Sequence, residues 1–197
     1  MIAGAVAFVL GALIDLFVLA VLVRFWMQAL RAPVRNPIAQ FTIALTDFAV
    51  KPMRRVIPGF FNLDLASLVV AWLAEFVLQV LKLLLLTDAS LTENPAVLSA
   101  VLFLALVQLV RLSIYVFMGA IIIQAVLSWF GSYHPTAPFF DALTRPFLKP
   151  IQRAIPPIGG VDISPVLVLI AFQLILMLPV AWLEGQAILL TRSMIQA

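Results

Sequence analysis

Several polar and ionisable side chains stand inside otherwise apolar stretches of this chain. If those stretches cross a bilayer, an unpaired charge at its centre costs at least about 2.5–3.5 kcal/mol, so such groups pair with one another or line a path for ions or protons. We expect Arg111 to pair with Asp15 or Glu75, and an ion or proton path is the alternative interpretation. The intramembrane candidates are Asp15, Glu75, Gln79, Lys82, Arg111 and Gln173.

Three of these candidates share one side of a helix. At about 100° per residue, Glu75, Gln79 and Lys82 fall within a sector of about 60°. This polar stripe is expected to face the interior of a helix bundle and not the lipid. Gln173 stands at the position that corresponds to Glu75 in the internal repeat described below.

A second set of candidates is basic and lies in two segments between the apolar stretches. On a helical wheel each segment gathers its Lys and Arg residues on one face and apolar residues on the other. Such a helix lies in the membrane interface, where it can bind anionic lipid headgroups or a cytoplasmic protein. The alternative is that both segments only link the spans and orient the chain. The candidates for lipid or partner binding are Lys51, Arg54, Arg55, Arg145, Lys149 and Arg153.

Prolines interrupt both basic segments. Pro52 and Pro150 lack the backbone donor and clash with the preceding turn. We therefore predict that each segment breaks at its proline and consists of two short helices.

Two aspartates precede apolar stretches. Asp64 and Asp162 can accept hydrogen bonds from the free amides of a helix N-terminus, so we interpret both as structural N-caps. Signatures of enzymes are sparse, because the chain has no cysteine, its single histidine is His134 in a loop, and it contains no phosphate-binding loop or nucleophile elbow. We expect no enzyme activity, no cofactor, no metal site and no nucleic-acid partner.

The composition indicates what must position these residues. Of the 197 residues 64% are apolar and 11% charged, and the mean hydropathy is +1.18. Apolar runs at 2–30, 65–87, 97–130 and 163–190 are each long enough to span a bilayer. We predict an all-α polytopic membrane protein with four transmembrane helices, five being the upper bound. The third run is about 51 Å long as one helix, so it must tilt, protrude or break, with Arg111 marking one position for a break.

The distribution of Lys and Arg predicts the orientation. Both basic segments are rich in these residues, whereas 88–96 contains Asp88 and Glu93 but no Lys or Arg. The positive-inside rule then places both basic segments in the cytoplasm and both termini outside.

An internal repeat relates the two halves. When residues 37–58 are laid on 135–156, an offset of 98 residues aligns many identical positions, among them a Lys-Pro pair and the following Arg. Asp64 and Asp162 obey the same offset. We predict two units in parallel orientation, 1–96 and 97–197, each with two spans joined by a basic amphipathic segment.

These repeated segments resemble the YggT (YlmG) family of small bacterial and plastid membrane proteins. The resemblance rests on NPI at 36–38, KPMRRVIP at 51–58, HPT at 134–136, KPIQRAIP at 149–156 and GGVDISP at 159–165, and on the RFWMQ stretch that begins at Arg24. The second copy differs, because Gln152 replaces an arginine and no equivalent of Arg24 is evident. The resemblance implies a bacterial inner-membrane location and links to osmotic stress, cell division and the assembly of membrane complexes or haem proteins.

Together these patterns favour a non-enzymatic accessory or assembly protein. Its duplicated basic segments would engage a protein partner or anionic lipid, with Arg55 and Arg153 as the first candidates, and self-association is left open. The alternative function is a small ion-translocating protein of osmotic homeostasis that uses the intramembrane charges. Whether the basic segments lie flat or re-enter the bilayer distinguishes a docking surface from a pore.

Overall fold

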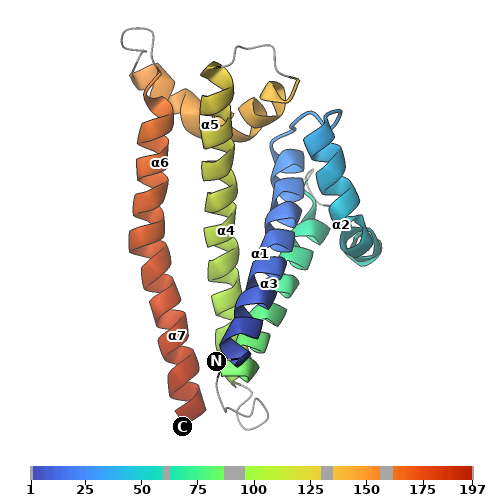
Figure 1. The fold of residues 1–197 in the computed structure, drawn as a ribbon, viewed down its shortest axis with the longest axis vertical. Helices are drawn as coiled ribbons and strands as arrows, with labels where there is room; N and C mark the ends of the chain where they lie inside the picture. The colour runs from blue at the N-terminus through green and yellow to red at the C-terminus, as the bar shows by residue number, and fades with distance from the viewer. Residues whose placement is uncertain (1, 60–62, 87–95, 130–134, 156–161, 197) are drawn as a thin grey trace.

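Four long helical segments dominate the chain, which confirms the all-α polytopic class. The structure, a computed structural model, describes residues 2–59, 63–86, 96–129, 135–155 and 162–196. The spans are α1 (Ile2–Ala29), α3 (Leu65–Leu86), α4 (Ala96–Trp129) and a fourth composed of α6 (Ser164–Ile175), a π-helical turn η1 (Leu176–Val180) and α7 (Ala181–Gln196). The helices α2 (Pro37–Val56) and α5 (Ala137–Ala154) join the spans of each half (Figure 1).

The third span is one continuous helix. α4 runs through Arg111 for 34 residues, so it does not break there. An arginine is a good helix former, and its charge is met by a side chain and not by the backbone. The excess length is accommodated without interruption of the helix.

The fourth span is interrupted in a way that the sequence analysis did not anticipate. Pro179 lies within the π-helical turn η1. A proline inside a helix removes one hydrogen bond and collides with the preceding turn, and one wider turn relieves that collision without ending the helix. The span therefore continues from Ser164 to Thr191.

The prediction of two short helices in each basic segment is wrong. α2 continues through Pro52, and α5 continues through Pro146 and Pro150. Pro52 and Pro150 both fall in the last turns of their helices, where a lost hydrogen bond affects little of the remaining helix. Each helix still closes regularly, with amide-to-carbonyl bonds of 2.8 Å from Ile57 to Met53 and from Ile155 to Ile151.

The helices form two packed groups. One apolar core joins α1, α2 and α3 with parts of α4 and α5, and a second joins α4, α5, α6 and η1. Rings from different helices connect the groups, since the centroids of Trp26 and Phe117 lie 4.8 Å apart and those of Phe117 and Phe147 lie 4.6 Å apart. In Figure 1 both termini lie at one end of the molecule, away from α2 and α5.

A buried ionic network fixes α2 against the spans of the first half. Arg24, at the end of α1, is 4% exposed and donates to Thr46 and to Asp47 of α2, both at 2.9 Å. Its Nε lies 3.9 Å from Asp64, which is 2% exposed. Arg54, also on α2, donates from Nε to Asp64 at 3.1 Å. The two arginines therefore share one buried carboxylate at the start of α3.

In the second half, uncharged side chains occupy the positions of the two arginines of this network. Gln152 donates to Asp162 at 2.8 Å, where the first half has Arg54 and Asp64. Thr144 donates to Gln124, where Thr46 accepts from Arg24. Gln124 is thus the spatial counterpart of Arg24. It escaped the sequence analysis because it stands 100 residues after Arg24, not 98.

The network perturbs the ionisation of Asp64. Burial alone would raise the pKa of this carboxyl, but hydrogen bonds from Arg54 and Ser67 outweigh burial and hold the pKa below its ordinary value. A carboxyl whose pKa is lower in the folded protein than in the unfolded chain stabilises the fold. This stabilisation is complete at pH values above the pKa that the carboxyl has in the unfolded chain, and it is lost as the pH falls through its pKa in the folded protein.

Replacing Asp64 with Asn should therefore destabilise the protein strongly at neutral pH. The substitution removes one of the carboxylates near the buried Arg24. Breaking a buried ion pair in this way should lower the free energy of unfolding by about 3 kcal/mol. The free energy of unfolding can be measured by titrating the protein in mixed micelles with dodecyl sulfate. The difference from the wild type should begin to shrink below about pH 4, where Asp64 of the unfolded chain takes up a proton, and should vanish only below the lower pKa that the folded protein gives this carboxyl.

Asp162→Asn is the matched control. Its partner Gln152 is uncharged, and Asn is as good a helix cap as Asp, so the cost should stay under about 1 kcal/mol. Equal destabilisation by the two substitutions would contradict the role given to the Arg24 and Arg54 charges.

Candidate functional site

The helices α2 and α5 expose their basic residues. On α2 the face formed by Ala39, Thr42, Thr46 and Val50 is buried. The six cations expected from the sequence all lie on exposed positions of the two helices: Lys51, Arg54, Arg55, Arg145, Lys149 and Arg153. Arg54 is partly committed to Asp64, and Lys51 pairs with Asp47 at 2.7 Å. The remaining four form no salt bridge with any acidic residue that the structure describes.

The cations of α5 line a groove. Arg145, Lys149 and Arg153 surround a hollow of about 340 Å³ beside Leu30, which follows α1, and none of the described residues that line it is acidic. Asp141 lines a neighbouring hollow of about 280 Å³ together with Arg145 and Lys149. Arg145 stands where the first half has Asp47, the residue that neutralises Arg24 and Lys51. This exchange of an acid for a base leaves the groove positively charged.

A second basic hollow lies between α1 and α2. It measures about 560 Å³, and its lining includes Arg31, Lys51 and Arg54 together with Asp47. Arg31 ends α1 with a φ of 54°, the left-handed conformation that glycine normally takes at a helix C-terminus. The Ala32 amide closes the helix onto the Met27 carbonyl at 2.8 Å. The chain thus keeps an arginine in a strained position that contributes to the basic hollow.

The apolar faces of α2 and α5 have different surroundings. Phe41 is 68% exposed, whereas its repeat counterpart Phe139 is 2% exposed. Leu45 and Leu143 differ in the same direction. α5 packs against α1 as well as its own half, whereas the contacts of α2 among the described helices are with α1 and α3 alone. Within the described structure, the face of α2 that contains Phe41 therefore remains free to enter lipid next to exposed cations.

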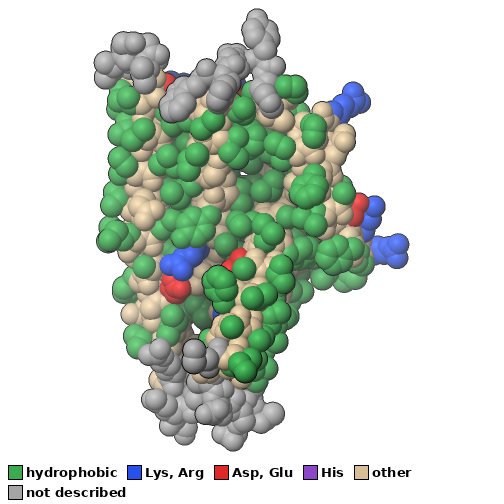
Figure 2. All heavy atoms as spheres, in the orientation of Figure 1, with side chains coloured by type: hydrophobic (Ala, Val, Ile, Leu, Met, Phe, Trp, Pro, Cys, Tyr) green, Lys and Arg blue, Asp and Glu red, His purple; other side chains and the backbone are tan. Residues whose placement is uncertain are grey.

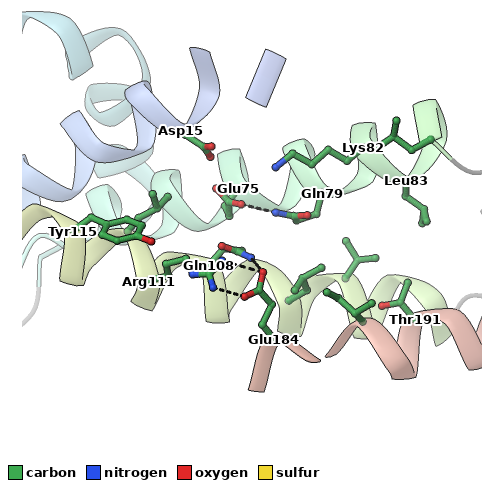
Figure 3. A pocket seen from close by; sticks show the side chains of 15 residues that line it. Asp15, Glu75, Gln79, Lys82, Leu83, Gln108, Arg111, Tyr115, Glu184 and Thr191 are labelled. Carbon is green, nitrogen blue, oxygen red and sulfur yellow. Dashed lines mark hydrogen bonds and ion pairs between the residues drawn. The ribbon is translucent and has the colours of Figure 1, made fainter. Parts of the chain in front are cut away.

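Five of the six intramembrane candidates, all except Gln173, line one cavity of about 680 Å³ between the two halves (Figure 3). One wall comes from α1 and α3 and the other from α4 and α7. In the described structure α7 packs against α4 and η1 and does not approach α1 or α3, so the cavity stays partly open. Figure 2 shows charged side chains in the lower half of a face that is otherwise mainly hydrophobic.

The wall of α1 and α3 carries the predicted polar stripe. Glu75 is 1% exposed, and its Oε1 accepts a hydrogen bond of 2.6 Å from Gln79. Its Oε2 is buried without a partner among the described residues. Asp15 of α1 and Lys82 lie on the same wall, and Lys82 passes over Gly11.

The opposite wall corrects the expected pairing of Arg111. Arg111 pairs with Glu184 of α7 and not with Asp15 or Glu75, and its Nη1 donates to Glu184 at 3.0 Å. Gln108 donates to the same carboxylate at 2.7 Å. Glu184 lies inside the predicted fourth span and was a visible signal that the sequence analysis missed. The pairing depends on α4 and α7 being neighbours, which no periodicity within one helix reveals.

The remaining predicted residues lie elsewhere. Gln173 is exposed on α6 and does not line the cavity, unlike its counterpart Glu75. Asp64 directly precedes α3 and accepts from the amide of Ser67 at 3.4 Å, as an N-cap does. Asp162 accepts from the amide of Ser164 at 2.9 Å, but the N-cap position of α6 belongs to Ile163, so Asp162 stands one residue before it. His134 lies outside the described residues.

Comparison with known proteins gives a consistent assignment. The sequence is 37% identical over 176 residues to an uncharacterized protein of Pseudomonas aeruginosa, covering 88% of this chain and 87% of that protein. It is 35% identical over 171 residues to one of Vibrio alginolyticus, with 86% and 90% coverage, and 30% identical over 173 residues to the uncharacterized protein YggT of Escherichia coli K12, with 87% coverage of both. No solved structure matches significantly. Since the sequence model of the CCB3/YggT family also matches residues 3–85 and 103–183, the chain belongs to that family.

Proposed function

We propose that this chain is a non-enzymatic accessory protein of the bacterial inner membrane that holds anionic lipid headgroups through α2 and α5. The observation that carries the proposal is the groove that Arg145, Lys149 and Arg153 line, because none of the described residues that line this groove is acidic. Near a negatively charged membrane surface each Lys or Arg contributes about 1 kcal/mol of attraction. Three cations on one helix face suit a phosphate or a polyanionic headgroup.

The buried network supports this proposal by holding the lipid-binding faces in place. Arg24 and Asp64 tie α2 to α1 and α3 and leave Arg55 exposed. On the same helix as Arg55, the rings of Phe41 and Phe48 are 68% and 73% exposed. Phe48 also contacts Phe17 of α1. An amphipathic helix with exposed rings and exposed cations inserts its rings among acyl chains and keeps its cations at the headgroups.

A duplication of the two-span unit supports two such faces on one side of the membrane. The family model matches residues 3–85 and 103–183, and each half contains a span, an amphipathic helix and a second span in the same order. We place both amphipathic helices in the cytoplasm, where the leaflet is anionic. A bound lipid patch or a protein docked on it would link the chain to cell division, membrane-complex assembly or osmotic stress.

Charge reversal of both arginines should abolish the lipid preference. Wild-type protein in detergent, mixed with equal amounts of phosphatidylglycerol and phosphatidylcholine, should retain the anionic lipid in native mass spectrometry. Arg55→Glu/Arg153→Glu should lower that preference by at least about tenfold, because two attractive charges become repulsive. Arg55→Lys/Arg153→Lys keeps the charge and is the control.

The same variants separate lipid from protein as the bound species. If the lipid preference persists but proteins crosslinked in membranes are lost, the basic faces dock a protein instead. Unchanged lipid and unchanged crosslinked proteins would remove the basis of the proposal.

The sidedness can be tested directly because the chain lacks cysteine. Single cysteines introduced at the exposed positions Ala154 and Ser193 would show on which side of the membrane each end of the helix bundle lies. A membrane-impermeant maleimide applied to spheroplasts should label Ser193→Cys at once and Ala154→Cys only after lysis. The reverse pattern would place the basic helices outside the cell and contradict this part of the proposal.

A second candidate function is the passage of small ions or protons through the cavity between the halves. It is favoured by the buried Glu75 carboxylate and the Arg111–Glu184 pair in the middle of the bundle. Purified protein in liposomes with an imposed proton or potassium gradient should then show flux that Glu75→Gln abolishes. Absence of flux under every gradient would count against transport and leave the lipid-binding proposal intact.

A further inference from the structure

The cavity contains a buried carboxylate oxygen whose partner is missing. Glu75 lies near the middle of α3 at 1% exposure, with Gln79 bonded to its Oε1 and no described partner for Oε2. Figure 3 shows the Glu75 carboxylate facing the cavity. A bare carboxylate oxygen away from water is strongly disfavoured, so it must gain a cation or a proton.

The charged groups around Glu75 do not balance. Asp15 faces it from α1, Lys82 from its own helix, Arg111 from α4 and Glu184 from α7. Arg111 is bound to Glu184 through two nitrogens, so this pair is neutral as a unit. Asp15 and Glu75 are left with Lys82, which forms no salt bridge with either of them. One negative charge on this wall is unmatched.

A proton suits the unmatched charge better than a metal ion. In the described residues no three His, Cys, Asp or Glu side chains come together to hold a metal. A metal ion beside Asp15 and Glu75 would also be repelled by the Lys82 ammonium. A proton needs only one oxygen, and two neighbouring carboxylates that cannot both be charged commonly share one.

We propose that Asp15 and Glu75 hold one exchangeable proton between them inside the membrane. A hydronium ion in the cavity gives its proton to the free Oε2 of Glu75 and becomes water, and the reverse step restores the carboxylate. Lys82 and Asp15 set the pH at which the exchange occurs. The site does not depend on lipid binding by α2 and α5, and it requires access from only one side, whereas transport requires access from both.

Dicyclohexylcarbodiimide tests the site because this apolar reagent reacts with protonated carboxyl groups. Wild-type protein in vesicles, treated over a range of pH and analysed by peptide mass mapping, should be labelled at Glu75, and labelling should fall as the pH rises. Glu184 should be labelled less, because Arg111 and Gln108 both donate hydrogen bonds to its carboxylate. Glu75→Gln should lose both the label and the protonated carboxyl band in pH-induced infrared difference spectra.

Substitutions of two residues near Glu75 should shift the pH midpoint of its labelling in opposite directions. Asp15→Asn removes a like charge, so the labelling midpoint should move to lower pH by about one to three units. Lys82→Met removes an opposite charge and should move the midpoint to higher pH. Circular dichroism and size-exclusion chromatography would establish that each variant remains folded.

The outcomes distinguish this site from the functions proposed above. A titrating label at Glu75 without flux in liposomes supports the proton site and rejects transport. Loss of lipid preference in the Arg55 and Arg153 variants with an unchanged label shows that the two sites are independent. Absence of both the label and the infrared band at every pH would overturn the proposal, as would a midpoint that neither neighbour shifts.

Discussion

A membrane interior has no water to solvate a charge, and this constraint organises the whole structure. The spans meet it mainly with apolar residues, and several of their few charges are paired across helices. Arg24 and Asp64 join three helices at one end of the first half, and Arg111 and Glu184 join α4 to α7. Each pair satisfies its charges only in this particular helix arrangement, so pairing and packing specify one another.

The two halves use one frame for different purposes. The first half pairs part of its basic segment internally, since Asp47 and Asp64 meet three cations, whereas Arg55 stays exposed. In the second half the counterpart of Asp47 is Arg145 and that of Arg54 is Gln152, so its cations face outward with fewer partners. Among the described residues the polar cavity has no counterpart at Gln173, which is exposed on α6. The two halves therefore differ both in their basic surfaces and in the polar groups of their spans.

Several sequence-based expectations failed for reasons that involve neighbouring helices. Pro52 and Pro150 were expected to break their helices, but both lie close enough to the ends for the helices to continue. Arg111 was expected to pair with Asp15 or Glu75, although Glu184 is the residue within reach. A helical wheel shows which residues share a face of one helix, but it does not show which other helix packs against that face.

The sequence by itself determined the features that depend on the length of the apolar runs and on the periodicity of an α-helix. Four apolar runs are long enough to cross a bilayer, and the spacing of Glu75, Gln79 and Lys82 places them on one face, because a helix in lipid must satisfy its backbone internally and segregate its polar side chains. The tertiary structure alone decided the contacts between helices. The bond between Arg111 and Glu184 and the unpartnered oxygen of Glu75 exist because α7 packs on α4 and away from α1 and α3, a choice made by side-chain fit over distant parts of the chain.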